Sequence, residues 1–487
     1  MSVSKRVFNN STILLLTNVI GKVALALVGI IIARKLGSGE LGKLAYAASV
    51  IAILDSISTF GLNIFTIRQI PKIEIDKVNN YQSQIFTLRF LVNFIFTLLF
   101  FLYTQIFILD GTIRVLFNVL NFASLINVYS SHWIILYRVK ENMKYEGILR
   151  IFDSVFYGLI GIVLVLNGFG VTYLVYTMFG ISIIKALFCH FTLRKETNYS
   201  IRFVFGRVDW INIMRGTFPF ALMTIIGIIY YRVDTIFIEI FLGLSFVGFY
   251  SASYKIMETF KIIPEILSTT VFPTLSQNLY KNSPLVLKST NQLLKWLNVF
   301  AFPLAVGGTL LADKGILFLY GDQFAPAIVV MQILIWALIP LFNSAITSAI
   351  INASKTPVIN LYLAIANLVI NVSLNLILIP VIGIKGAAIA TVANESVGFI
   401  LGYLYINHSI FRLDISKEVL KIIFASSMMG LLIIFTGRNL ILIPAYIIVY
   451  FIIVFIIKLF NPEDWLILKK ITPNFIRNRL IPLKEGL

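Results

Sequence analysis

The stretch TILLLTNVIGKVALALVGIIIA, residues 12–33, decides the fold of this chain. An α-helix needs about 20 predominantly apolar residues to cross the hydrocarbon core of a bilayer, and this stretch has that length. Comparable apolar stretches follow one another as far as Phe460, separated only by short polar loops. The sequence therefore predicts an all-α, polytopic membrane protein with about 14 transmembrane helices.

The composition agrees with a membrane protein and leaves little room for an active site. Charged residues make up only 13% of the chain, against about 25% in soluble proteins. Lys5 and Arg6 precede the first apolar stretch without a small-residue cleavage site after it, so we expect a retained helix. The sequence has no nucleotide-binding glycine loop, no zinc-ligand spacing and a single cysteine, Cys189. We expect neither an enzyme nor a bound cofactor or metal.

The net charge of +18 is mainly a signal of membrane topology. Lys and Arg concentrate in alternate loops, among them residues 138–150 and 194–215. By the positive-inside rule these loops face the cytoplasm, which places both termini there as well. Scattered loop charge without a nucleic-acid motif predicts no nucleic-acid partner.

The longest basic connection divides the chain into two similar halves. We expect a six-helix lobe over residues 1–195, a cytoplasmic linker over 196–215 and a second six-helix lobe over 216–410. Residues 411–487 would form a helix pair and a basic cytoplasmic tail. Leu36-Gly37 followed by Gly42 recurs as Leu242-Gly243 followed by Gly248 at a constant offset, which indicates an internal repeat.

Several charged residues lie inside the predicted spans. A charge at the centre of a bilayer costs about 2.5–3.5 kcal/mol, so such groups normally face a partner or a water-filled cavity. In the helix predicted over 246–272, Lys255, Glu258, Lys261 and Glu265 share one face. They either form a ladder of ion pairs that joins helices, or line a cavity in which unneutralised lysines meet an anionic substrate.

Two more bases need an explanation. Lys22 has no carboxylate on its own helix, so it either contacts substrate or pairs with Asp55 on the next helix. Arg232 has a planar fork that suits a diphosphate. Arg34 and Lys185 lie near helix ends, and we expect them to extend towards the membrane surface.

These arguments give three groups of candidate site residues. The predicted diphosphate-binding cavity contains the bases Lys22, Arg232, Lys255 and Lys261. The carboxylates that could either bind a coupling proton or sodium ion or form ion pairs are Asp55, Asp234, Glu258, Glu265 and Glu395. The amides that could either join helices or contact sugar are Asn367, Asn371 and Asn375.

Specific strings resemble a known family over essentially the whole chain. They are Ala33-Arg34-Lys35-Leu36-Gly37, Arg232-Val233-Asp234-Thr235, Gly248-Phe249-Tyr250-Ser251-Ala252, Asn352-Ala353-Ser354-Lys355 and the run from Asn371 to Thr391. Together they are similar to the polysaccharide transporters, the Wzx-type oligosaccharide flippases of the multidrug/oligosaccharidyl-lipid/polysaccharide (MATE-like) superfamily.

The resemblance implies two six-helix lobes around a central cavity that opens to one side at a time. It implies an undecaprenyl-diphosphate-linked oligosaccharide as substrate, moved to the outer leaflet of a bacterial cytoplasmic membrane for O-antigen, capsule or exopolysaccharide synthesis. Membrane lipids, a coupling ion and a polysaccharide polymerase are the implied partners. Without an ATP site in the sequence, energy must come from an ion gradient, the membrane potential or the substrate's own gradient.

The sequence alone leaves other functions open. A peptidoglycan-precursor lipid flippase or a cation-coupled drug exporter would have the same fold. The exporter would favour uncompensated carboxylates, whereas this chain has several bases at mid-depth. A membrane polysaccharide polymerase or ligase would need a sizeable outer loop, and the predicted outer loops are short. A structural scaffold gives no reason for buried charge.

Overall fold

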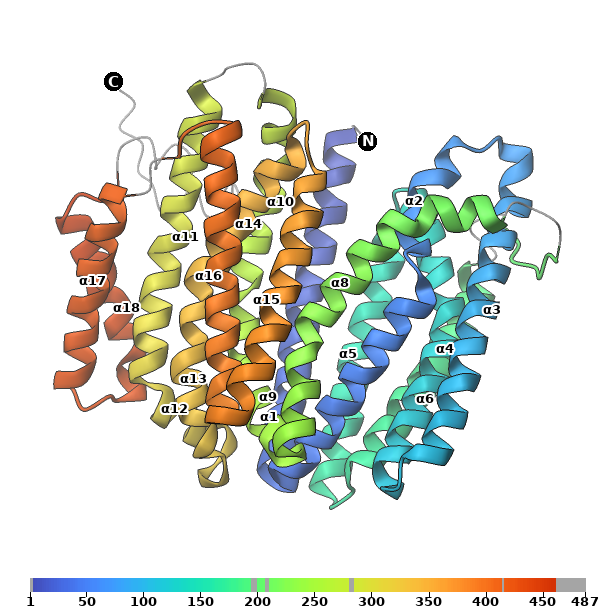
Figure 1. Cartoon of the computed structure of the whole chain (residues 1–487), viewed down its shortest axis with the longest axis horizontal. Coiled ribbons are helices and arrows are strands. Elements are labelled where there is room, and N and C mark those ends of the chain that lie inside the picture. Colours follow the sequence, from blue (N-terminus) through green and yellow to red (C-terminus); the bar gives the residue numbers. More distant parts are fainter. Residues whose placement is uncertain (1–2, 194–198, 206–209, 280–283, 414–415, 461–487) are drawn as a thin grey trace. The chain divides into compact units, whose positions relative to one another are not determined.

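The computed structural model describes residues 3–193, 199–205, 210–279, 284–413 and 416–460, and within these ranges every regular element is a helix (Figure 1). This confirms the predicted all-α fold. The α-helices are α1 (Val3–Thr59), α2 (Leu62–Gln69), α3 (Ile75–Phe107), α4 (Gly111–Val139), α5 (Lys144–Leu166), α6 (Val171–Phe188), α8 (Trp210–Leu242), α9 (Leu244–Phe260), α10 (Ile262–Asn278), α11 (Pro284–Leu310), α12 (Ala312–Tyr320), α13 (Pro326–Leu334), α14 (Leu338–Ala353), α15 (Val358–Ile382), α16 (Ile384–Ser409), α17 (Ser416–Phe435) and α18 (Ile443–Ile456).

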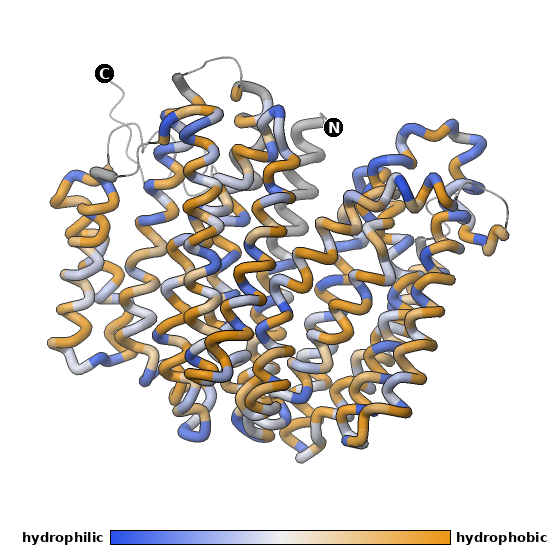
Figure 2. The backbone as a smooth tube through the Cα atoms, viewed as in Figure 1, coloured by the Kyte–Doolittle hydropathy of each residue, from blue (hydrophilic) through white to orange (hydrophobic). Residues whose placement is uncertain are grey.

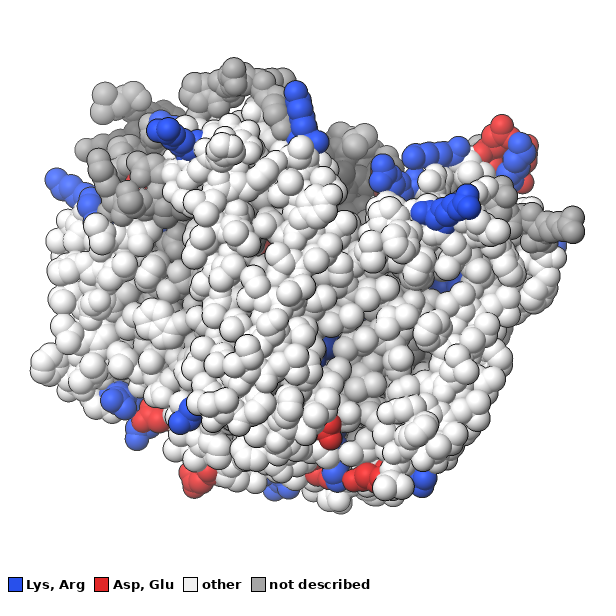
Figure 3. Space-filling model, in the orientation of Figure 1, with Lys and Arg blue, Asp and Glu red and all other residues white. Residues whose placement is uncertain are grey.

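The helices are suited to a bilayer. Within the described ranges, nine of them are long and apolar enough to cross a membrane. Large apolar side chains such as Leu99 and Ile106 are exposed on the sides of the helices, which are mostly apolar in Figure 2. In Figure 3 the charged side chains gather mainly at the helix ends. The chain is therefore a multi-pass membrane protein; the count of about 14 spans and the cytoplasmic termini stay predictions.

One predicted helix is two helices in the structure. We expected a single helix over 246–272, but α9 ends at Phe260 and α10 begins at Ile262. Pro264 explains the break, because it has no N–H to donate to the carbonyl of Phe260 and its ring crowds that carbonyl. The prediction of one continuous charged face from Lys255 to Glu265 is therefore wrong.

The chain forms two compact units. Unit 1 comprises residues 1–262, 316–334 and 358–398, and unit 2 comprises the remaining segments. In unit 1, Val28 and Ile32 of α1 belong to a buried core with Phe117 of α4. The core of unit 2 is built from α11, α17 and α18. The division into lobes at 1–195 and 216–410 stays a prediction, and the tail over 461–487 lies outside the described residues.

The repeated glycine motif has the same backbone conformation in both copies. Gly37 has φ 86° and ψ 179°, which bends α1 into two helices, and Gly243 has φ 91° and ψ 173°. A Cβ added at Gly42 would overlap the carbonyl oxygen of Leu244, and one added at Gly248 would overlap that of Ser38. The offset that relates Gly42 to Gly248 also relates Ser38 to Leu244, so each contact is the counterpart of the other. The structure therefore supports an internal repeat.

Arg34 has a structural role instead of extending towards the membrane surface. Its guanidinium donates to the carbonyls of Phe318 and Leu319, with Nε 2.8 Å from the oxygen of Leu319. These carbonyls belong to the last turn of α12, where a helix leaves acceptors unsatisfied. The predicted role of Arg34 is therefore corrected to that of a link between α1 and α12.

Candidate functional site

Asp234 lies on α8 in the interior of unit 1 and is 5% exposed. Its Oδ1 accepts a hydrogen bond from Asn375 Nδ2 at 2.8 Å. Its Oδ2 accepts from the hydroxyls of Tyr250, at 2.8 Å, and Thr391, at 3.1 Å. Asn371 also donates to the carboxylate. We call these five residues the Asp234 cluster.

Helical spacing assembles the cluster. Asn371 and Asn375 are one turn apart on α15, which packs against α8, so both amides face the same carboxylate. Asn375 Nδ2 also lies 3.2 Å from Asn371 Oδ1. Both asparagines are buried. Their predicted contact with sugar is therefore not the role that this geometry favours, because the two amides are turned to Asp234.

When Asp234 is ionised, its charge is not neutralised by an ion pair with a described residue. In the ranges that the structure describes, no Lys or Arg forms an ion pair with Asp234, and Oδ1 of Asn375 has no hydrogen-bond partner. A buried carboxylate without a counter-charge costs several kcal/mol. Carboxylate, amide and hydroxyl oxygens are the ligands that hard cations prefer. The cluster can therefore accept a proton or a small cation such as sodium.

An ammonium group, that of Lys261, directly follows α9 and is linked to the Asp234 cluster through Tyr254. Tyr254 packs on Tyr250, with ring centroids 5.8 Å apart. Lys261 Nζ donates to the Tyr254 hydroxyl at 3.2 Å and lies 4.6 Å from the centroid of the Tyr231 ring. Aromatic faces stabilise a cation without neutralising it. Lys261 also interacts electrostatically with the carboxylate of Glu395, so its positive charge is partly balanced within unit 1.

Other ionisable groups approach the same tyrosine. Tyr254 interacts electrostatically with Arg232, Glu258 and Glu395. Lys255 lies close enough to interact with Arg232 and Glu258, yet within the described ranges neither Lys255 nor Glu258 forms an ion pair. Glu395 of α16 accepts a hydrogen bond from Tyr230. Three of the four predicted diphosphate-binding bases, Arg232, Lys255 and Lys261, therefore lie around Tyr254. We call these bases, with Tyr231 and Tyr254, the basic cluster.

The remaining predicted residues lie on other parts of the fold. Lys22 is half-buried on α1. Glu265 is exposed on α10 in unit 2. Asn367 of α15 packs against α16, where a Cβ added at Gly398 would lie 2.5 Å from Asn367 Nδ2. That contact suits the helix-joining role that we weighed for Asn367.

A second polar site lies among α1, α4, α5 and α6. Asp55, Ser124, Asp153 and Lys185 are among the side chains that line a cavity of about 430 Å³. The Ser124 hydroxyl donates to Asp55 Oδ1 at 2.7 Å, and Lys185 Nζ is 2.8 Å from Asp153 Oδ2. The expectation that Lys185 extends towards the membrane surface is therefore wrong, because a carboxylate on α5 lies within its reach.

Sequence reasoning missed Arg89, which lies on α3 and is 4% exposed. Its Nη2 donates to Ser131 Oγ at 2.7 Å, and it interacts electrostatically with Asp55. Within the described residues, its Nε and Nη1 have no hydrogen-bond partner. The signal in the sequence is an arginine within an apolar stretch. A guanidinium inside a membrane span is costly, so Arg89 is a candidate functional residue on the same grounds as Arg232.

Buried ionisable side chains inside a multi-pass helical bundle are typical of the class of membrane transport proteins. A solved structure of this class, "Lipid II flippase MurJ, inward closed conformation", matches 92% of this chain and 98% of its own, with TM-score 0.76 and 15% identity. An inward-facing multidrug resistance MATE family transporter matches 80% of this chain and 94% of its own, with TM-score 0.63 and 15% identity. The chain belongs to the polysaccharide biosynthesis protein family, whose family model matches residues 7–279.

Curated relatives agree with this family. "Probable flippase AglR" of Haloferax volcanii is 27% identical over 284 residues, which are 54% of each chain. "Probable low-salt glycan biosynthesis flippase Agl15" of the same organism is 27% identical over 183 residues, which are 37% of this chain and 39% of the relative. The chain spans about half the length, or less, of the curated relatives it matches. The resemblance to polysaccharide transporters is confirmed.

Proposed function

We propose that this protein is a cation-coupled flippase that carries a lipid-linked oligosaccharide to the outer leaflet of the membrane. The observation that supports this is the link between a buried carboxylate and a base: Tyr250, which donates to Asp234, packs on Tyr254, and the hydroxyl of Tyr254 accepts a hydrogen bond from Lys261. The carboxylate would bind the coupling cation. The bases would bind the diphosphate of the substrate.

The two clusters suggest how the cation and the substrate are coupled. While Asp234 is negative, it attracts the neighbouring bases and competes with a diphosphate for them. A cation bound at Asp234 cancels that attraction, so the basic cluster binds the diphosphate more strongly. Arg232 can then bind two phosphate oxygens with its planar fork, while Lys261 acts as a point charge. Binding of one ligand therefore favours binding of the other, as coupled transport requires.

The substrate class comes from the family and the relatives. The matching family is one of polysaccharide biosynthesis, and both curated relatives are named flippases. We extend this to an undecaprenyl-diphosphate-linked repeat unit for a bacterial surface polysaccharide, handed on to a polymerase. Rocking of two six-helix lobes, with both termini in the cytoplasm, would expose the substrate to one side at a time.

Transport in proteoliposomes tests the proposed function. The purified protein should flip a fluorescent undecaprenyl-diphosphate-linked oligosaccharide faster when an inward sodium or proton gradient is applied than without one. Dithionite quenching of outer-leaflet fluorophore measures the rate. Equal rates with sodium, potassium and proton gradients and with none would contradict cation coupling while leaving flipping itself supported.

Competing substrates test the choice of cargo. A peptidoglycan precursor and an organic cation, each offered at the same concentration, should be moved at least about tenfold more slowly than the oligosaccharide, because the precursor has a different head group and the cation has no diphosphate for the bases to bind. Faster movement of the peptidoglycan precursor would favour a precursor flippase. Faster movement of the organic cation would favour a drug exporter.

Replacing Lys261 by methionine should raise the apparent KM for the lipid-linked oligosaccharide about 10- to 100-fold. A hydrogen bond to a charged group contributes about 1.5–3 kcal/mol, and methionine retains the apolar part of the side chain without the charge. The measurement is the rate of flipping against substrate concentration. Lys385→Met, which removes an exposed lysine from the first turn of α16, is the matched control and should leave KM unchanged. Equal KM values for both variants would remove Lys261 from the substrate site.

A further inference from the structure

The segment at residues 199–205 has no regular secondary structure and is held against α3 by side chains of that helix. Gln82 and Ser83 donate to the carbonyl of Ser200, at 2.6 and 3.0 Å. The amide of Val204 donates to Thr87 Oγ1 at 2.9 Å. Ser83 and Thr87 are one turn apart on α3, so they form a polar face of that helix. Their hydroxyls bond backbone groups of residues 199–205 that have no partner in a helix or sheet. We call residues 199–205 the strap.

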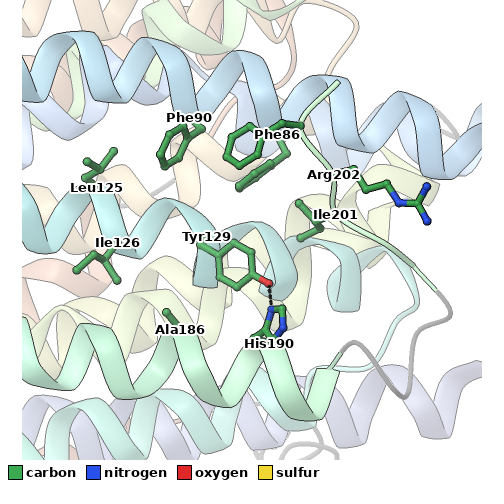
Figure 4. Close-up of a pocket in the computed structure, with 10 residues that line it drawn as sticks. Phe86, Phe90, Leu125, Ile126, Tyr129, Ala186, His190, Ile201 and Arg202 are labelled. Carbon is green, nitrogen blue, oxygen red and sulfur yellow. Dashed lines mark hydrogen bonds between the residues drawn. The ribbon is translucent and has the colours of Figure 1, made fainter. Parts of the chain in front are cut away.

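The strap closes one side of an apolar pocket (Figure 4). The pocket has a volume of about 500 Å³ and is lined by aromatic and aliphatic side chains of α3, α4, α6 and the strap. Phe203 of the strap lies 5.5 Å from Phe86 and 5.2 Å from Phe90, measured between ring centroids. This volume and lining are typical of a small-molecule site, for which the usual range is about 300–1,000 Å³.

The pocket has a polar end and an apolar end. At the polar end, the Tyr129 hydroxyl and His190 Nδ1 are 2.7 Å apart, and His190 belongs to a π-helical turn that follows α6. Arg202 is exposed there and points away from the ring side chains in Figure 4. The apolar end is lined by Phe90, Leu125 and Ala186, which lie further along their helices. The polarity therefore runs from the helix ends towards the interior of the membrane.

We propose that this pocket binds one acyl chain of an anionic membrane phospholipid, with the lipid phosphate at Arg202. A phospholipid has the same order of groups, with a charged head at the membrane surface and apolar chains below it. Within the described lining, Arg202 is the single Lys or Arg, so it matches the one charge of a phosphodiester better than a diphosphate. The ligand is thus distinct from the lipid-linked oligosaccharide proposed for the basic cluster.

Native mass spectrometry of the purified full-length chain tests the proposal. The protein is equilibrated with phosphatidylglycerol and phosphatidylcholine that carry the same acyl chains at equal concentration. The wild type should retain phosphatidylglycerol about fivefold better, as expected for one arginine near an anionic lipid surface. Arg202→Ala should lower the retention of phosphatidylglycerol to that of phosphatidylcholine. Ala186→Phe, which fills the apolar end, should lower the retention of both lipids.

Two controls distinguish lipid binding in this pocket from general attraction of anionic lipids to the protein and from binding of the lipid-linked substrate. Lys72→Ala removes an exposed charge outside the pocket and should keep the fivefold preference. Arg202 is exposed, so its replacement tests the proposal even if Ala186→Phe does not fold. An unchanged preference in Arg202→Ala would overturn the proposal. Displacement of phosphatidylglycerol by an equal concentration of undecaprenyl monophosphate would overturn the choice of ligand. None of these results depends on whether the protein flips an oligosaccharide.

Discussion

Asp234→Asn should abolish the dependence of transport on the cation gradient while leaving the protein folded. Asparagine has nearly the same shape and can still accept hydrogen bonds from Tyr250 and Thr391, but it carries no charge. The attraction between a monovalent cation and a carboxylate at about 4 Å is about 4 kcal/mol at an effective dielectric constant of about 20. Its loss corresponds to a fall of up to about a thousandfold in cation affinity. Gradient-driven flipping in proteoliposomes measures the effect.

Thermal unfolding with and without the coupling cation gives an independent measurement. A ligand at about 100 times its Kd stabilises the native state by about 2.7 kcal/mol, so the wild type should melt at a higher temperature with the cation and the variant should not respond. Without the cation the variant should be at least as stable as the wild type, because a buried carboxylate without a counter-charge is removed. Asp76→Asn, in the exposed first turn of α3, is the matched control. Cation-driven transport by Asp234→Asn would exclude Asp234 as the coupling site.

Gly248→Ala should cause the largest loss of stability among single small substitutions in α9. The added methyl would overlap the Ser38 carbonyl, and a backbone oxygen cannot rotate away as a side chain can. Overpacking of this kind costs about 1–3 kcal/mol, and more where the backbone must shift. Gly42→Ala should act similarly, because its methyl would overlap the Leu244 carbonyl. Thermal unfolding of the purified variants measures both effects.

Gly227→Ala is the matched control for these two substitutions. Gly227 lies in α8 of the same unit, and a Cβ added there would meet no atom within 4 Å. Alanine also favours a helix over glycine by about 1 kcal/mol, so this variant should be unchanged or slightly stabilised. If Gly248→Ala and Gly227→Ala melted at the same temperature, the close approach of α1 and α9 would have no energetic importance.

The order of the helices could be predicted because the apolar residues that define each membrane helix are consecutive in the sequence. An apolar run of about 20 residues defines a membrane helix whatever it packs against, and the predicted stretch over 12–33 lies within α1. The break at Lys261 was also a local feature, since Pro264 was visible in the sequence. A proline inside an apolar run predicts a break or a kink, and here the structure has a break.

The candidate site could be predicted only in part because burial and pairing depend on neighbouring helices. Arg232 and Asp234 are two residues apart and therefore lie on nearly opposite sides of α8, and the structure places Asp234 among neutral donors. Phase alone could not show that Asn375 is the donor, because α8 and α15 are far apart in the sequence. The pairing of Lys185 with Asp153 and the burial of Arg89 depend on packing in the same way.

The contacts Gly42–Leu244 and Gly248–Ser38 are equivalent in the two repeats, and this equivalence bears on how such a chain could arise. A contact that maps onto itself when two copies are swapped is what a two-fold axis produces in a homodimer. A half-length ancestor with one glycine motif could therefore have made the same contact between two identical subunits before gene fusion. In that ancestor a single codon would have set both sides of the contact. After fusion the two glycines can mutate independently. A side chain introduced at either glycine would then overlap the backbone carbonyl that it faces, because the other repeat has not changed.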